Sequence, residues 1–222
     1  MLRSSDKHTQ AGITGLETAI ILIAFVVVAS VFAFTVLSTG VFASERSKET
    51  IYEGVEETKT SLSPRGSTRV ETGDVDGTTS VVKVTFNVAS AVNSSESIDL
   101  TPPYVVDESG LDPDVSGLES LTIASYTDSD QRVTDAAWTV RFMGGGNDDF
   151  ILDPGELAQI TVWLHEVDTD TGLYTLGDGD PFLADRLVAN ETFNITFDPT
   201  QGSTMDIQRT IPGRLNPFLD LK

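Results

Sequence analysis

The chain has 222 residues, with 34 acidic residues against 14 Lys and Arg and a formal net charge of −20. So acidic a surface repels nucleic-acid phosphates and anionic lipid head groups, and it argues against a nucleic-acid partner. The same composition is typical of a protein that works in high salt, where screening removes most of the self-repulsion. Because there is no cysteine, a disulfide framework and a thiolate metal site are both excluded.

One apolar run dominates the N-terminal region. No charged residue occurs between Glu17 and Glu45, and residues 20–38 are almost all apolar. About 20 such residues are enough to cross a bilayer as one helix. The apolar residues lie on all sides of that helix, so it needs apolar surroundings everywhere, either lipid or a bundle of like helices.

A short segment with Arg3 and Lys7 precedes this run. In an ordinary secretory signal peptide the cut falls beyond the apolar region, and Ala29-Ser30 or Ala33 could serve as that site. The run is longer than the usual signal region, however. A cut inside it would discard the best helix of the chain.

The sequence Gly12-Ile13-Thr14-Gly15-Leu16-Glu17, followed by the apolar run, resembles the archaeal flagellins (archaellins) and other archaeal type IV pilin-like proteins. The resemblance implies that residues 1–12 are a leader, which a membrane peptidase removes between Gly12 and Ile13. Glu17 would then be the fifth residue of the mature chain, where pilin-like subunits often carry an acid. Gln10 and Ala11 depart from the family, because many of its leaders have Lys or Arg there.

Two roles are open for Glu17. A carboxylate buried unpaired at the rim of an apolar run costs several kcal/mol, so the new α-amine of Ile13, from the same or a neighbouring subunit, could neutralise it. Alternatively, Glu17 lies in the first helical turn, where the helix dipole favours a negative side chain by about 0.3–1 kcal/mol. The two roles are compatible.

Beyond Gly40 the helix becomes polar but keeps a narrow apolar seam of Ile51, Val55 and Leu62. The first strong stop signal is Ser63-Pro64-Arg65-Gly66, which predicts a helical domain over residues 13–63. The part from Gly15 to Leu62 would be about 70 Å long. Such a helix is suited to contact with copies of itself.

Residues 64–222 predict a second domain built of strands. Strict alternation of apolar and polar residues marks the strands 80–89, 158–165 and 192–197. Shorter candidates are 68–72, 97–100, 104–106, 120–128, 137–143, 186–188 and 205–211, separated by Gly- and Asp-rich turns. The sequence therefore predicts an α+β chain: a long N-terminal hydrophobic helix followed by an antiparallel, immunoglobulin-like β-sandwich.

No constellation for catalysis is visible. The two histidines are His8, in the leader, and His165, which we expect on the polar surface face of its strand; there is no Gly-x-Ser-x-Gly motif and no phosphate-binding loop. We therefore expect no enzyme activity, no cofactor and no small-molecule substrate. The acidic turns with Asp168, Asp170, Asp178 and Asp180 are weak candidates for Ca²⁺, but they do not match an EF-hand loop, and ordinary solvated turns explain them equally.

Three sequons mark Asn93, Asn190 and Asn194 as candidates for N-glycosylation. Sequons occur by chance, but an exported protein exposes them to glycosylating enzymes. Asn194 is expected on the polar face of its strand.

By resemblance, the function is that of a structural subunit of an archaellum filament used for swimming, assembled through its N-terminal helix. The implied partners are copies of itself, the leader peptidase and a membrane assembly platform, with the precursor in the cell membrane and the product in an extracellular filament. An adhesive type IV-like pilin is an alternative. A membrane-anchored sandwich that binds envelope partners and a soluble ligand-binding protein released by ordinary signal cleavage are two others.

Overall fold

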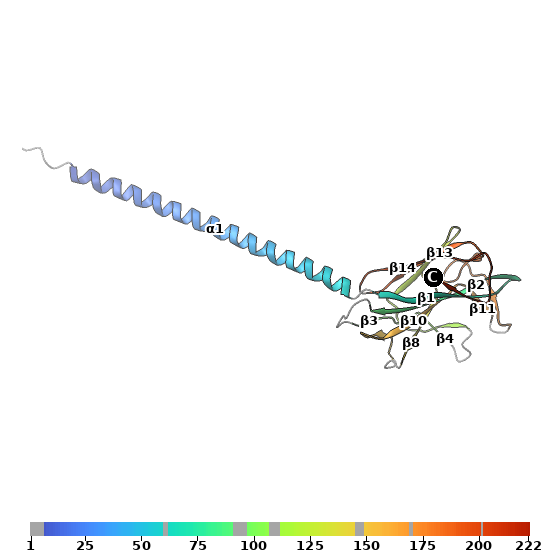
Figure 1. Cartoon of the computed structure of the whole chain (residues 1–222). Coiled ribbons are helices and arrows are strands. Elements are labelled where there is room, and N and C mark those ends of the chain that lie inside the picture. The colour runs from blue at the N-terminus through green and yellow to red at the C-terminus, as the bar shows by residue number, and fades with distance from the viewer. Residues whose placement is uncertain are drawn as a thin grey trace, which may run out of the picture. The chain divides into compact units, whose positions relative to one another are not determined.

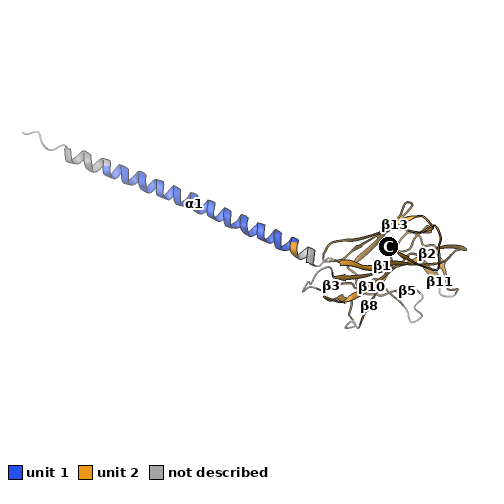
Figure 2. Ribbon diagram, in the orientation of Figure 1, with its two compact units in different colours: residues 1–54 blue, residues 55–222 orange. Residues whose placement is uncertain are grey.

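We describe the protein from a computed structural model. The structure describes residues 7–59, 62–90, 97–106, 112–144, 149–168, 171–200 and 202–222. For residues 7–14 and 56–59 it describes the backbone only. The chain divides into two compact units (Figure 2). Residues 1–54 form what we call the helical unit. Residues 55–222 form the strand unit.

The helical unit contains most of one uninterrupted helix, α1 (Lys7–Lys59), of 53 residues, whose last residues, 55–59, count with the strand unit (Figure 1). At 1.5 Å per residue it is about 80 Å long. The prediction that this helix continues to Leu62 is wrong, because β1 (Leu62–Val75) begins there. The signal Ser63-Pro64-Arg65-Gly66 therefore lies inside a strand, where Leu62 pairs with Ser90 of β2 (Thr78–Ser90).

Hydroxyl side chains within the apolar stretch of α1 bond to the helix itself. Thr35 donates to the carbonyl of Val31 at 2.8 Å, Thr39 to that of Thr35 at 2.8 Å, and Ser30 to that of Val27 at 2.9 Å. An unpaired hydroxyl costs free energy in an environment without water, and these local bonds remove that cost. The helix can therefore enter apolar surroundings without seeking outside partners for these groups.

The larger sheet of the strand unit has seven strands in the order β11-β12-β1-β2-β10-β8, with β15 also paired to β1. The members beyond β1 and β2 are β8 (Trp138–Met143), β10 (Leu157–Trp163), β11 (Glu166–Asp168), β12 (Leu173–Thr175) and β15 (Phe218–Leu221). Most pairs are antiparallel, but β1 and β12 are parallel through Val75 and Tyr174. The sheet is therefore mixed and departs in this pair from the antiparallel expectation.

The smaller sheet has the order β14-β13-β6-β7. Its strands are β6 (Ile123–Thr127), β7 (Arg132–Val133), β13 (Thr192–Asp198) and β14 (Met205–Thr210). Two short ribbons complete the unit: β3 (Ile98–Asp99) with β9 (Ile151–Leu152), and β4 (Tyr104–Val106) with β5 (Pro113–Val115).

The hydrophobic core forms where the two sheets face each other. Phe197 of β13 contacts Phe86 of β2 and Trp138 of β8 edge-on, with ring centroids 6.3 and 5.0 Å apart. Alternation explains the packing, because every second residue of β2 and β13 points inward and those side chains are buried. Figure 1 shows the strands of both sheets gathered in this unit.

Nine of the ten predicted strands are confirmed within the described residues. The exception is Arg186–Val188, which is not a strand. Its backbone still reaches the sheet at one point, because the amide of Val81 donates to the carbonyl of Leu187 at 3.0 Å. Leu187 is therefore held at the sheet and buried, but one backbone hydrogen bond without a ladder does not make a strand.

Candidate assembly surfaces and modification sites

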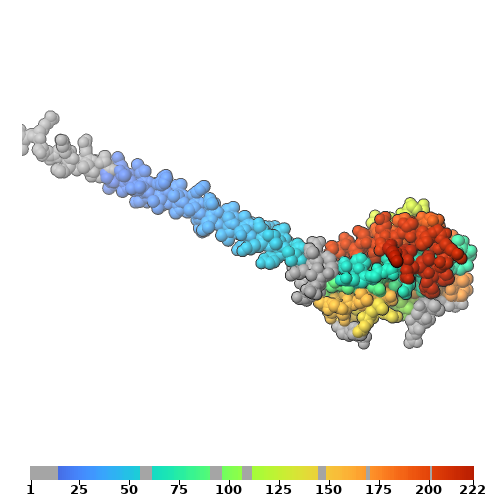
Figure 3. Space-filling model, in the orientation of Figure 1, coloured from blue at the N-terminus to red at the C-terminus, as the bar shows by residue number. Residues whose placement is uncertain are grey.

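Between Glu17 and Glu45 the surface of α1, which Figure 3 draws in space-filling view, carries no charged side chain and has apolar side chains on every side. Every side chain from Gly15 to Val55 is exposed in the isolated chain, and large apolar ones such as Phe25 and Phe34 are 74% and 73% exposed. By length and composition this 41-residue stretch is the one described helix that could cross a membrane. Exposure of such an apolar surface to water is unfavourable, so lipid or other helices must cover it.

Gly12 and Ile13 lie within the helical backbone of α1. Glu17 is exposed and comes ten residues after the helix begins at Lys7. In the uncut chain Glu17 is therefore not in the first turn. Only a cut near Gly12 would place it there, one helical turn from the new α-amine.

Two members of the predicted seam, Ile51 and Val55, lie on α1 and are 64% and 45% exposed. The third, Leu62, is a correction: it lies in β1, is 6% exposed and belongs to the core of the strand unit. Helical spacing alone suggested its place in the seam, but the chain has already left the helix there. The seam on α1 is therefore Ile51 and Val55.

The three sequons differ in their surroundings. Asn190 is exposed in the turn before β13, at a backbone φ of 68°. Asn194 is half-buried in the central strand β13, where its Nδ2 donates to Thr196 Oγ1 at 3.3 Å and its Oδ1 is buried without a hydrogen-bond partner in the described chain. Asn93 lies outside the described residues. Asn190 thus offers the more accessible amide of the two that are described.

The acidic turns do not converge on one point. Asp180 accepts hydrogen bonds from Thr134 and from the backbone of Asp135, while Asp168 accepts one from the backbone of Thr171 at 3.2 Å. Asp178 is exposed, and Asp170 lies outside the described residues. Among the residues that the structure describes, no group of three or more His, Cys, Asp or Glu could hold a metal ion.

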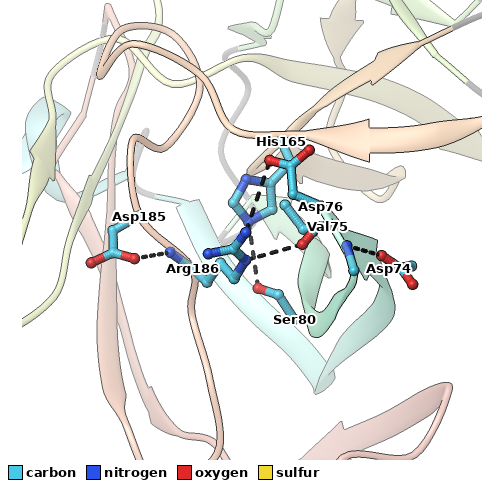
Figure 4. Close-up of polar contacts among 8 residues, drawn as sticks. Asp74, Val75, Asp76, Ser80, His165, Asp185 and Arg186 are labelled. Atoms are coloured by element: carbon cyan, nitrogen blue, oxygen red, sulfur yellow. Dashed lines mark hydrogen bonds and ion pairs between the residues drawn. The ribbon is translucent and has the colours of Figure 1, made fainter.

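His165 lies in the interior, so the expectation of a surface residue is wrong. It is 0% exposed, and its neighbour Trp163, also expected on the polar face, is 2% exposed. Alternation fails here because other segments cover this strand end: Ser80 and Arg186 lie at His165, and Lys83 lies over the Trp163 ring. Figure 4 shows the His165 ring with Ser80, Arg186 and Asp76 around it.

In the described chain, the His165 ring has one hydrogen-bond contact. Ser80 Oγ lies 3.5 Å from His165 Nε2, and Nδ1 is buried without a hydrogen-bond partner in the described chain. Burial, and next the positive charge of Arg186, lower the pKa of His165 to about 4. A catalytic triad needs an acceptor on the far ring nitrogen, and this ring has none there.

Sequence patterns gave no signal for one further surface. Val115, Leu118, Leu121 and Ile123 of the strand unit are 74%, 48%, 56% and 47% exposed. They come from β5, the following loop and the start of β6, so no single period links them. Only the fold brings Val115, Leu118 and Ile123 to one groove.

A long exposed helix with an apolar run, joined to a strand unit that has its own core, is the arrangement of a subunit that assembles into a filament through its helix. The archaeal-type flagellin family model matches residues 12–209. The chain belongs to the archaeal-type flagellin family. It is therefore a structural subunit of the archaellum, the extracellular filament with which archaea swim.

Individual relatives agree with this assignment. A probable flagellin 1 of Aeropyrum pernix is 30% identical over 210 residues, which cover 92% of this chain and 93% of the relative. A probable flagellin 1 of Archaeoglobus fulgidus is 30% identical over 214 residues, covering 96% and 95%. The solved archaeal flagellum of Methanospirillum hungatei has a similar fold, with a TM-score of 0.54, 22% identity and coverage of 93% of this chain and 98% of that one. The fold of a long helix followed by strands is thus shared.

Proposed function

We propose that the chain is made as a membrane-held precursor, is cut between Gly12 and Ile13, and then passes its helix from lipid into a bundle of like helices. The observation that carries the proposal is the continuous exposure of α1 from Gly15 to Val55. A leader peptidase and a membrane assembly platform are the partners that this route requires. The precursor lies in the cell membrane, and the product lies in the filament.

The transfer of α1 from lipid to a helix bundle requires little hydrophobic free energy. Lipid tails and a bundle of apolar helices are both apolar, so moving α1 between them changes its hydrophobic free energy little. The hydroxyls of Thr35 and Thr39 stay bonded to their own helix in either place. Packing between helices then decides the direction of the exchange.

The proposed cut is supported by the helix and by the family match. The match begins at residue 12, so the first eleven residues lie outside it. Cleavage after Gly12 would put Glu17 four residues from the new α-amine of Ile13, which is the spacing at which helical side chains meet. Glu17 can then neutralise that amine, in its own or in a neighbouring subunit, at the rim of the apolar run.

The first experiment determines the N-terminal residue of the purified filament protein. We expect Ile13. A start at Ala33 or near Ser30 would mean ordinary signal cleavage and would overturn the proposal. A Gly12→Trp variant, which blocks the cut while leaving α1 intact, should accumulate in the membrane without filaments.

The second experiment tests the seam. Replacing Ile51 and Val55 together by Asp should abolish filaments, because two carboxylates then face neighbouring helices. The matched control is Arg46→Asp with Thr50→Asp, which has the same spacing of four residues roughly 140° away around the helix. Normal filaments with the seam variant, or equal loss with both, would remove the seam from the assembly surface.

We also propose N-glycosylation of the exported chain, at Asn190 in preference to Asn194, since Asn190 is exposed and the amide of Asn194 is engaged. Asn93 is a further candidate from its sequon. Intact mass measurement tests this with Thr192→Val and Thr196→Val, which remove one sequon each and keep the β-branched shape. If Thr192→Val changed the mass only by the difference between the two side chains, Asn190 would be ruled out.

A further inference from the structure

A groove of about 510 Å³ opens on the strand unit. We call it the apolar groove; its walls include Tyr104, Val115, Leu118 and Ile123, with the carboxylates of Asp135 and Asp180. Val115 is 74% exposed, and Leu118 and Ile123 are each almost half exposed. Exposed apolar side chains that gather on so acidic a surface are unfavourable in water unless a partner covers them.

The apolar groove is held in shape by the β4–β5 ribbon. Tyr104 pairs with Val115 in the ladder, and the backbone amide of Ser116 donates to the carbonyl of Pro103 at 2.9 Å. The hydroxyl of Ser116 adds a bond to the carbonyl of Pro102 at 2.9 Å. The ring of Tyr104 also packs against Phe182, with centroids 6.3 Å apart. Because the walls are fixed in advance, a partner would not have to order them.

The charge of the apolar groove is negative. Asp180 accepts hydrogen bonds from Thr134 Oγ1 at 3.0 Å and from the backbone amide of Asp135 at 3.3 Å, and neither carboxylate has an ion pair in the described chain. Burial and then Asp180 raise the pKa of Asp135. A partner that fits must bring positive charge together with apolar surface.

The same chain carries positive charge beside the exposed Pro212 in another groove. A second groove of about 630 Å³, which we call the basic groove, includes Thr192, Arg209, Thr210, Pro212, Leu221 and Lys222. The described chain gives Arg209 and Lys222 no ion pair, and Arg209 Nε is buried without a hydrogen-bond partner. The acid in this groove, Asp220, is already paired with Arg69 at 3.6 Å.

The strand unit places the two grooves at opposite corners of the smaller sheet. Ile123, in the apolar groove, pairs with Asp198 at the end of β13, whereas Arg209, in the basic groove, pairs with Phe193 near its start. Five residues of strand separate these points, about 17 Å. The pairings also lie on opposite edges of β13, through β6 and β14. One copy therefore cannot bring its own two grooves together, but two copies can.

We propose that the basic groove of one subunit docks on the apolar groove of the next, so that strand units of neighbouring copies meet head to tail along the filament. The two surfaces differ, so the contact is heterologous and repeats without closing, as a filament requires. It rests on the proposed helix-driven assembly. The helices hold the strand units at high effective concentration, so this contact can be small and weak and still be occupied.

Pairs of introduced cysteines test the contact in intact filaments, because the chain has no cysteine of its own. Under mild oxidation, Val115→Cys with Thr210→Cys should give a ladder of covalent multimers beyond the dimer. The control pair, Val115→Cys with Thr79→Cys, places the second cysteine at an exposed site of β2 outside the basic groove and should give none. Filaments that form but give no ladder above the control overturn the contact while leaving helix-driven assembly untouched. Dimers from Val115→Cys alone would indicate a two-fold contact and also overturn it.

A charge exchange tests the same pairing without covalent bonds. Asp135→Lys and Lys222→Glu should each lower the temperature at which filaments dissociate, and the two together should return it to that of the parent. Tryptophan fluorescence of each variant checks that the strand unit stays folded. If the dissociation temperature of the double variant is lowered by the sum of the two single decreases, Asp135 and Lys222 do not face each other across the contact. If the parent protein itself formed no filaments, that result would count against helix-driven assembly and not against the contact between the grooves.

Discussion

The two units use similar apolar residues in opposite ways. In α1 every side chain from Gly15 to Val55 faces outward and is exposed, including Ile, Val, Leu and Phe throughout. In the strand unit the same residue types are buried between two sheets, and Val70, Val84, Ile160 and Phe197 are all 0% exposed. The core of the strand unit is buried within one chain, whereas the apolar side chains of α1 are buried only by other molecules.

This difference determines how each region responds to mutation. A change in the core of the strand unit alters the folding free energy of one chain, and a change in α1 alters association. Both tryptophans of the chain, Trp138 and Trp163, are buried in the strand unit. Tryptophan fluorescence therefore reports on that unit alone, and filament counts by negative-stain microscopy report on α1.

The largest effect is expected from a charge inside the apolar run of α1. Val27→Asp should abolish filaments, because a carboxylate at the centre of an apolar helix costs about 2.5–3.5 kcal/mol in lipid and has no partner in a helix bundle. The fluorescence melting curve of the full-length protein in detergent should not change.

Val27→Leu is the control and should give normal filaments. If Val27→Asp also shifted the fluorescence melting curve, the two units would not be energetically separate, and the comparison would fail.

The strand unit should respond in the opposite sense to loss of a core ring. Phe197→Ala removes the contacts with Phe86 and Trp138, and we expect a loss of about 3–5 kcal/mol in the free energy of unfolding. Denaturant unfolding followed by tryptophan fluorescence measures it.

Phe218→Ala provides the matched control, since this ring is 66% exposed and its removal should change stability by about 0.5 kcal/mol or less. Equal losses from the two variants would mean that the core does not lie between the sheets.

Local sequence signals were sufficient wherever one residue period persists. The apolar run of residues 20–38 identified α1, and alternation identified β2, β10 and β13, because those patterns record which face each residue presents. The resemblance around Gly12 to Glu17 identified the family. The strands β5, β7, β9, β11, β12 and β15, of two to four residues, were missed, because their pairing depends on neighbours supplied by the fold.

The errors at Leu62 and His165 share a cause. Each residue fits a local period, helical for Leu62 and alternating for His165, yet each is buried by segments distant in sequence. The apolar groove escaped prediction for the same reason, since β4, β5 and β6 contribute one or two residues each. No window along the chain contains that information.

Acid should weaken the strand unit through His165. The pKa of His165 is lowered to about 4 in the folded chain and is about 6.5 when unfolded, so the unfolded state binds the proton more readily. Its stability contribution is therefore complete above pH 6.5 and falls as the pH drops toward 4. Between pH 7 and pH 5 we expect a loss of about 2 kcal/mol from this group.

His165→Gln isolates this contribution, because the amide does not titrate. The variant should be less stable than the parent at pH 7, yet its stability should depend less on pH between 7 and 5. Identical pH dependence in parent and variant would show that His165 is not the titrating group. Filament assembly through α1 should be affected less than the fluorescence melting curve.

The smallest effects should come from two exposed ion pairs of the described residues, one in the strand unit and one on α1. Arg69 and Asp220 lie 3.6 Å apart with side chains 60% and 63% exposed, and Arg46 and Glu49 lie 3.8 Å apart with side chains 74% and 61% exposed. Asp220→Asn should lower the unfolding free energy of the strand unit by about 1 kcal/mol or less at low salt, measured by tryptophan fluorescence. Because 1 M salt shortens the screening length to about 3 Å, the effect should vanish there. Arg46→Gln should likewise leave filament yield unchanged in high salt. A loss above about 2 kcal/mol that persists in 1 M salt would mean that Asp220 does more than pair with Arg69, and that surface charge, as well as burial, holds the strand unit together.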